Sequence, residues 1–158
     1  MKTLVLGSTS PFRKIILEKL QLPFNCAKPG IDEIALLDES PQALVERLAI
    51  EKAKAIKPQY PCALIIGSDQ VAVCDGEILG KPHNFDNGVM QLTKFSGKSI
   101  TFYTGLCVYD SENDKTVSLV EPFIVHFNEL SQDEIKNYLN AEQPYNCAGS
   151  FKSEGLGI

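Results

Sequence analysis

The chain has 158 residues, of which 44% are hydrophobic and 22% are charged, and these values are typical of one ordinary globular domain. Its formal net charge of −5 argues against a nucleic-acid partner, because a general nucleic-acid binder would carry a basic face. No apolar run approaches the roughly 20 residues of a membrane-spanning helix, so no membrane partner is expected either.

The N-terminal segment predicts a strand that leads into a helix. Leu4–Leu6 is better explained as a buried strand than as part of a signal peptide, so a cytoplasmic protein is expected. In the turn that follows, Ser10 suits the N-cap of a helix and Pro11 suits its first position. The helix is expected to run to about Leu20.

The rest of the chain alternates helical and strand patterns. Three more helices are expected at 41–56, 87–95 and 132–139, each with a capping or stop signal at one end or both. The strands are expected at 63–73, 77–79, 99–109 and 116–127, and the last two form an antiparallel hairpin. This mixture predicts a single α/β domain over 1–158 with a mixed sheet.

Lys52 has an unusual position on the second predicted helix. It falls between Leu48 and Ile56, inside the apolar stripe, whereas Lys54 lies on the solvent face. A lysine on the core-facing side either snorkels to the edge of the core, which is the commoner case, or points into a polar cavity.

Asp69 is the strongest local anomaly in the sequence. It stands between Ile65-Ile66 and Val71–Val73, in the middle of what should be a core strand. An ionised carboxylate there is costly unless it is paired, hydrogen-bonded or bound to a metal ion. A buried structural ion pair and a catalytic or metal-binding role both stay open, and Gly67 suggests the close approach of a ligand.

Other segments carry groups suited to an anion. Hydroxyls and backbone N–H groups cluster between Ser8 and Arg13, where a strand meets a helix N-terminus, although Ser10 alone could serve as a cap. Lys81 follows a strand end, and Asp32-Glu33 lies in a loop that can return toward the same cleft. A lone lysine or glutamate is more often a solvated surface residue.

Familiar catalytic signatures are absent from the sequence. Ser96–Ser99 imitates the end of a P-loop, but Leu92 stands where the first glycine belongs. His83 and His126 are not spaced as metal ligands, and the five cysteines include no Cys-x-x-Cys. A mechanism based on carboxylates and a metal ion is therefore favoured over a nucleophilic one.

Taken in order, these motifs resemble the Maf family of nucleotide pyrophosphatases over essentially the whole chain. The matching segments are Ser8–Arg13, Asp32-Glu33, Glu51–Ala53, Gly67–Gln70, Gly80–Pro82 and Cys147–Gly155. The resemblance implies two lobes of one α/β fold with an elongated mixed sheet and a central cleft, in the Maf/ITPase-like arrangement. It also implies a nucleotide substrate, a divalent cation such as Mg²⁺ or Mn²⁺, and a cytoplasmic protein that is often a homodimer.

The resemblance further implies a role for each matching residue. Asp69 would be the proton acceptor that activates water, and Glu33 would help to hold the metal ion, sharing it with Asp69. The residues expected to bind the triphosphate are Arg13, Lys52 and Lys81, with Ser8 and Ser10 at the helix N-terminus.

Base specificity is assigned by the resemblance to Phe12, Gln70 and Glu154. Gln70 after Asp69 is similar to the branch that acts on 7-methyl-GTP, whereas the branch for dTTP and UTP carries threonine there. N7-methylation gives guanine a positive charge that an aromatic face attracts, and a carboxylate can accept hydrogen bonds from the N1 and N2 edge. The 7-methyl-GTP branch usually has tryptophan at position 12, and phenylalanine there keeps the stacking with a weaker cation–π attraction.

The expected activity is hydrolysis of 7-methyl-GTP to 7-methyl-GMP and diphosphate, which would clear modified nucleotides. A dTTP/UTP pyrophosphatase of the same family and a non-catalytic nucleotide-binding regulator of cell division are the alternatives. Family members normally continue past Gly155–Gly157 with a further helix and strand, so this chain is expected to lack that element.

Overall fold

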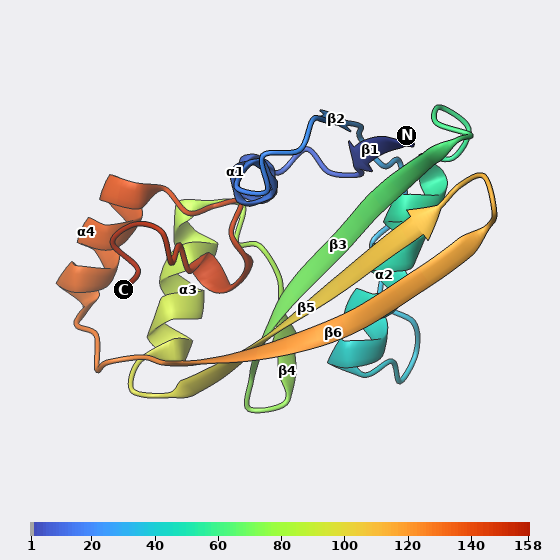
Figure 1. The fold of residues 1–158 in the computed structure, drawn as a ribbon. Helices are drawn as coiled ribbons and strands as arrows, with labels where there is room; N and C mark the ends of the chain where they lie inside the picture. The colour runs from blue at the N-terminus through green and yellow to red at the C-terminus, as the bar shows by residue number, and fades with distance from the viewer. Residues whose placement is uncertain (1) are drawn as a thin grey trace. The chain divides into compact units, whose positions relative to one another are not determined.

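The computed structural model describes residues 2–158 (Figure 1). In chain order its elements are β1 (Thr3–Leu6), α1 (Pro11–Glu18), β2 (Phe24–Cys26), α2 (Pro41–Ala55), β3 (Ala63–Cys74), β4 (Glu77–Leu79), α3 (Phe85–Phe95), β5 (Ser99–Asp110), β6 (Lys115–His126), α4 (Gln132–Glu142) and the 3₁₀ helix η1 (Ala148–Ser150). The six strands form one sheet with the order β2-β1-β3-β5-β6, and β4 pairs with β3. β1 is parallel to β2 and β3, whereas β4 is antiparallel to β3, so the predicted α/β class with a mixed sheet is confirmed.

The chain divides into two compact units. Unit 1 comprises the described part of Met1–Asp69 together with Thr104–Glu121, and unit 2 comprises Gln70–Tyr103 and Pro122–Ile158. The strands β3, β5 and β6 each have 12 residues and run through both units. The two lobes that the resemblance implies are present as these two units, and each has its own hydrophobic core.

In unit 1, α2 supplies much of the core. Ser40 caps this helix by accepting a hydrogen bond from the Ala43 N–H at 3.2 Å, and Pro41 occupies the first helical position, as the sequence predicts. Buried side chains then recur every three or four residues along one face of the helix. The core cluster comprises Val5, Ala27, Ala49, Ala53, Ile56, Ala63, Ile65, Cys107 and Tyr109.

Two glycines allow the backbone of α2 to lie very close to the sheet. A Cβ atom on Gly67 would lie 2.0 Å from the carbonyl oxygen of Ala49, and one on Gly105 would lie 2.1 Å from that of Val45. Neither glycine has a positive φ, so the requirement is for space rather than for an unusual backbone conformation. The expectation that Gly67 makes room for a ligand is therefore wrong, because the neighbour is α2.

In unit 2, α3 and α4 pack against the sheet strands. Asn84 caps α3, and Ser131 with Glu134 forms the predicted capping box at the start of α4. The core cluster comprises Ala72, Cys74, Leu92, Phe95, Ile100, Phe102, Ile135, Leu139 and Ala148. Cys74 in this core and Cys107 in unit 1 are free, buried thiols, consistent with their use as small hydrophobic side chains.

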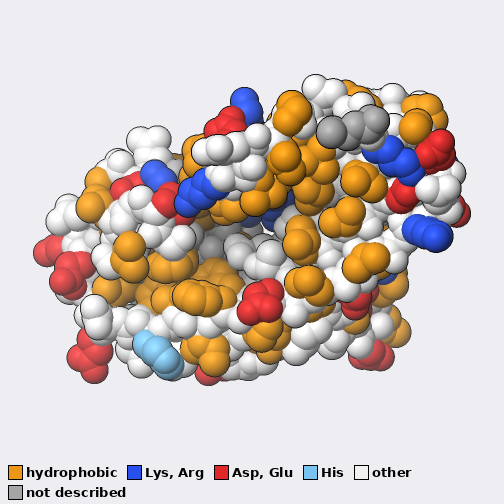
Figure 2. Space-filling model, viewed as in Figure 1, with side chains coloured by type: hydrophobic (Ala, Val, Ile, Leu, Met, Phe, Trp, Pro, Cys, Tyr) orange, Lys and Arg blue, Asp and Glu red, His pale blue; other side chains and the backbone are white. Residues whose placement is uncertain are grey.

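A hollow of about 630 Å³ lies on unit 2 and is lined mainly by apolar side chains, including Val125, Phe127, Phe151 and Leu156. Figure 2 shows hydrophobic side chains gathered at the surface around the C-terminal end of the chain, beside α3 and α4. Among the described helices, none is both long and apolar enough to cross a membrane.

Several element boundaries differ from the sequence prediction. α1 ends at Glu18 rather than near Leu20, and none of its residues is buried. α3 begins at Phe85, earlier than predicted, because Asn84 supplies its cap. The three-residue elements β2 and η1 were not predicted, since so few residues carry no detectable periodicity and no hairpin turn marks them as Asp75-Gly76 marks the equally short β4.

Candidate active site

The turn between β1 and α1 gathers two hydroxyls and a guanidinium. Ser8 is buried, and its Oγ accepts a hydrogen bond from the Ser10 N–H at 3.1 Å. Arg13 reaches the same Oγ through its Nη1 at 3.4 Å. The Oγ of Ser10 accepts the Arg13 N–H at 3.4 Å, so Ser10 caps α1 as predicted. This arrangement at a helix N-terminus favours an anion, and phosphate binding here stays a prediction.

The fold places Lys52 against Asp69. Lys52 follows Leu44 and Leu48 at four-residue intervals on α2, and all three side chains are buried. On β3, Asp69 lies two residues after Gly67 and therefore on the same face of the sheet. Because α2 approaches the sheet closely at Gly67, the Lys52 side chain lies against the Asp69 carboxylate.

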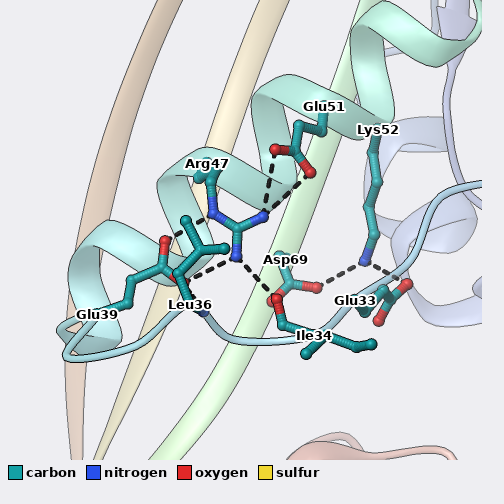
Figure 3. Close-up of polar contacts among 8 residues, drawn as sticks. All are labelled: Glu33, Ile34, Leu36, Glu39, Arg47, Glu51, Lys52 and Asp69. Atoms are coloured by element: carbon teal, nitrogen blue, oxygen red, sulfur yellow. Dashed lines mark hydrogen bonds and ion pairs between the residues drawn. The ribbon is translucent and has the colours of Figure 1, made fainter.

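Lys52 lies between two carboxylates (Figure 3). Its Nζ is 2.6 Å from Oδ1 of Asp69 and 2.8 Å from Oε1 of Glu33. The side chains of Lys52 and Asp69 are 6% and 10% exposed, whereas that of Glu33 is 56% exposed. Lys52 therefore does not reach the surface but ends between the carboxylates of Asp69 and Glu33. The charge of Asp69 is paired with the Lys52 ammonium, which offsets the cost of burying it.

Arg13 interacts electrostatically with the same two carboxylates, those of Asp69 and Glu33. Burial lowers the pKa of Arg13 below its ordinary value, and the negative charges of Asp69 and Glu33 oppose this shift. The guanidinium remains charged in any case. Arg13 and Lys52 together carry two positive charges and the two carboxylates carry two negative charges, so this part of the site is formally neutral.

The remaining predicted site residues are more exposed. Phe12 on α1 is half-buried, and Gln70, Lys81 and Glu154, all in unit 2, are exposed. Burial is the main cause that raises the pKa of the Cys147 thiol, and among weaker causes Glu154 raises it while Lys81 lowers it. The charges of Lys81 and Glu154 therefore both act on this thiol of unit 2, and their contact with a nucleotide stays a prediction.

The donor chemistry of the site suits the predicted divalent cation. Mg²⁺ usually binds one or two carboxylates together with water and substrate phosphates. Glu33 and Asp69 supply two carboxylates that meet at one ammonium group. Within residues 2–158 no group of three or more His, Cys, Asp or Glu side chains is placed to hold a metal ion. A cation at Glu33 and Asp69 would therefore depend on phosphate oxygens to complete its ligand set.

A second ionic network beside this group was not predicted from the sequence. Arg47 on α2 contacts Glu39, Glu51 and the carbonyl oxygen of Ile34 (Figure 3). An arginine on a half-exposed helix position is ordinary in a sequence, and only its partners in space distinguish it.

The mixed α/β fold is consistent with one known protein family. The Maf-like protein family matches residues 3–158, so the chain belongs to this family. Three relatives are named 7-methyl-GTP pyrophosphatase. The protein from Colwellia psychrerythraea (strain 34H) is 84% identical over 158 residues, which are 100% of this chain and 79% of the relative.

The other two relatives are more distant but cover nearly the same region. The protein from Idiomarina loihiensis is 55% identical over 157 residues, 98% of this chain and 79% of the relative. That from Pseudomonas savastanoi pv. phaseolicola is 54% identical over 158 residues, 100% of this chain and 82% of the relative. The branch that the sequence resembles is therefore the one for which these three relatives are named.

Proposed function

We propose that this protein is a nucleoside triphosphate pyrophosphatase that hydrolyses 7-methyl-GTP to 7-methyl-GMP and diphosphate, and so clears modified nucleotides. The observation that carries the proposal is the buried Lys52–Asp69 pair with Glu33 on the same ammonium group. The names of the relatives support the choice of reaction and of base.

In the proposed reaction, water attacks the α-phosphorus of the nucleotide. The bond between that phosphorus and the oxygen bridging to the β-phosphate breaks, and diphosphate leaves with the bridging oxygen. Asp69 accepts the proton that the attacking water loses. The Lys52 ammonium, 2.6 Å from Oδ1, fixes the orientation of this carboxylate, as a general base requires.

Binding a triphosphate adds several negative charges to the part of the site that is formally neutral, which consists of Arg13, Lys52, Glu33 and Asp69. The Ser8 hydroxyl and the Arg13 guanidinium, which lie within hydrogen-bonding distance of each other, are proposed to take phosphate oxygens. Lys81 is proposed as a further phosphate ligand. Glu33 and Asp69 are the residues that would hold Mg²⁺ or Mn²⁺, which when bound would stabilise charge on the phosphoryl oxygens.

The methylated base carries a delocalised positive charge. Phe12, half-buried at the start of α1, is proposed to stack on it, and Glu154 is proposed to accept hydrogen bonds from its Watson–Crick edge. Gln70 is proposed to complete the selection of the base. A homodimer in the cytoplasm is proposed from the same family resemblance, and light scattering of the purified protein tests the dimer.

The experiment compares diphosphate release from 7-methyl-GTP, GTP, dTTP and UTP, each with Mg²⁺ and with Mn²⁺. The proposal predicts the highest kcat/KM for 7-methyl-GTP. Preference for dTTP or UTP would assign the protein to the other branch. Binding of nucleotides without any turnover would support a regulator instead of an enzyme.

A further inference from the structure

The segment that carries Glu33 has few ordinary means of holding its position. Residues 27–40 contain no helix and no strand. The apolar side chains of Ile34, Leu36 and Leu37 are 75%, 60% and 94% exposed, so they contribute little hydrophobic burial. Within 31–39 only Ile31 among the apolar side chains is half-buried, so polar contacts are the main means of fixing the segment in place.

Arg47 supplies several of these contacts from α2 (Figure 3). Its Nε and Nη2 bind the two carboxylate oxygens of Glu39 at 2.7 and 2.8 Å, in a bidentate pair. Its Nη2 also binds the carbonyl oxygen of Ile34 at 3.0 Å, and its Nη1 binds both oxygens of Glu51 at 3.2 Å. These bonds come from all three nitrogens of the planar guanidinium, an arrangement that a lysine cannot match.

Glu39 closes the segment on itself. One of its oxygens accepts the Leu36 N–H at 3.0 Å, and the carbonyl oxygen of Leu36 accepts the Glu39 N–H at 3.2 Å. The Glu39 side chain is only 7% exposed. Hydrogen bonds from Arg47, followed by that from Leu36, lower the pKa of Glu39 to about 2. The carboxylate is therefore held ionised against the guanidinium.

We propose that Arg47 is a positioning residue for the reaction and that it acts through Glu33. Ile34 follows Glu33 directly, and α2 holds both residues, one through Arg47 and the other through Lys52. Arg47 and Lys52 are five residues apart, a rise of roughly 7.5 Å along the helix, so two neighbouring residues of the segment are bound at separate points of one rigid element. This inference rests on the proposed function, in which Glu33 acts on the bound nucleotide.

Hydrogen exchange tests the holding of the segment without any need for activity. The amides of residues 31–39 are followed by mass spectrometry in the wild type, Arg47→Met and Glu39→Gln. Both variants break the bidentate pair between Arg47 and Glu39. Glu39→Gln is the milder change, so the exchange measurement can still be made with it if Arg47→Met folds poorly. Lys2→Met is the matched control, because Lys2 in the same unit also pairs with two carboxylates and is 25% exposed against 23% for Arg47.

Kinetics then test whether Arg47 acts through Glu33. In the wild-type background, Arg47→Met should lower kcat/KM for 7-methyl-GTP by about 10- to 100-fold, as expected for misplacement of a site residue by about 1 Å. In a Glu33→Gln background, Arg47→Met should lower kcat/KM by less than about twofold. An effect that acts through the Glu33 carboxylate is lost once that carboxylate has been removed. Arg47→Lys should not restore the rate, since it lacks the planar fork.

The two sets of data separate the possible failures. The proposal predicts faster exchange over 31–39 in both variants but not in Lys2→Met, together with the background-dependent rates. Unchanged exchange, or an equal loss of rate in both backgrounds, would overturn it. An inactive wild type would instead refute the proposed function, and exchange alone would then decide whether Arg47 holds the segment.

Discussion

Gly67→Ala is the substitution that tests most sharply how the fold assembles the site. The added Cβ would lie 2.0 Å from the Ala49 carbonyl oxygen, whereas ordinary contact begins at 3.4 Å, so α2 and β3 must separate locally by about 1.4 Å. Overpacking of this kind costs about 1–3 kcal/mol, and at about 2 kcal/mol the Tm of a chain of this length should fall by about 4–8 °C. A shift of that size beside Lys52 should also lower kcat by about 100-fold.

Gly105→Ala is the matched control for this prediction. Its Cβ would lie 2.1 Å from the Val45 carbonyl oxygen, an almost identical overlap with the same helix, but about two turns away from Lys52. Because the Gly105 overlap lies two residues from Arg47, both variants are compared in the Arg47→Met background. There, thermal melts should show similar losses of Tm, whereas diphosphate release should fall much further in Gly67→Ala. A wild-type Tm for Gly67→Ala would refute the close contact. Equal losses of activity in the two variants would refute the idea that this contact sets the position of Lys52.

Three further predictions concern individual charged and aromatic side chains. Lys52→Met should destabilise the protein by about 3 kcal/mol in urea unfolding, because it leaves buried negative charge unpaired. The exposed Lys54→Met should cost less than about 1 kcal/mol, since it loses only a cation–π contact with Tyr109. The pKa of Glu39 is lowered from 4.5 to about 2, so its contribution is present above pH 4.5 and is lost as the pH falls toward 2. The Tm difference between wild type and Glu39→Gln should therefore be largest near pH 6 and should shrink steadily below pH 4.5. Phe12→Trp should raise the kcat/KM ratio of 7-methyl-GTP to GTP about two- to fivefold through a stronger cation–π attraction, and an unchanged ratio would exclude stacking at this position.

Much of unit 1 could be predicted because local signals and periodicity agreed there. The Ser-Pro pairs at the starts of α1 and α2 specified both caps. Lys52 was conspicuous because it breaks a helical apolar stripe, and Asp69 because it interrupts a buried strand. Both anomalies mark buried charges in the structure, and they are in fact partners.

What could not be predicted depends on contacts between residues distant in sequence. Glu33 lies on a segment without periodicity, so the family resemblance rather than a local signal assigned it to the site, and its contact with Lys52, 19 residues later, was not predicted. Gly67 suggested a ligand because a strand glycine only signals that something comes close, and here that neighbour is α2. The role of Arg47 depends on five hydrogen bonds to residues spread from Ile34 to Glu51, which a sequence does not display.

In the proposed reaction, the carboxylate of Asp69, held by Lys52, accepts a proton during hydrolysis of a nucleoside triphosphate. Asp69→Asn keeps the shape of the side chain and removes its basic oxygen. With 7-methyl-GTP and Mg²⁺ or Mn²⁺, diphosphate release should fall by about 10²- to 10⁴-fold, the usual contribution of a general base, while calorimetry still detects bound nucleotide. Diphosphate release at the wild-type rate from Asp69→Asn would contradict the account.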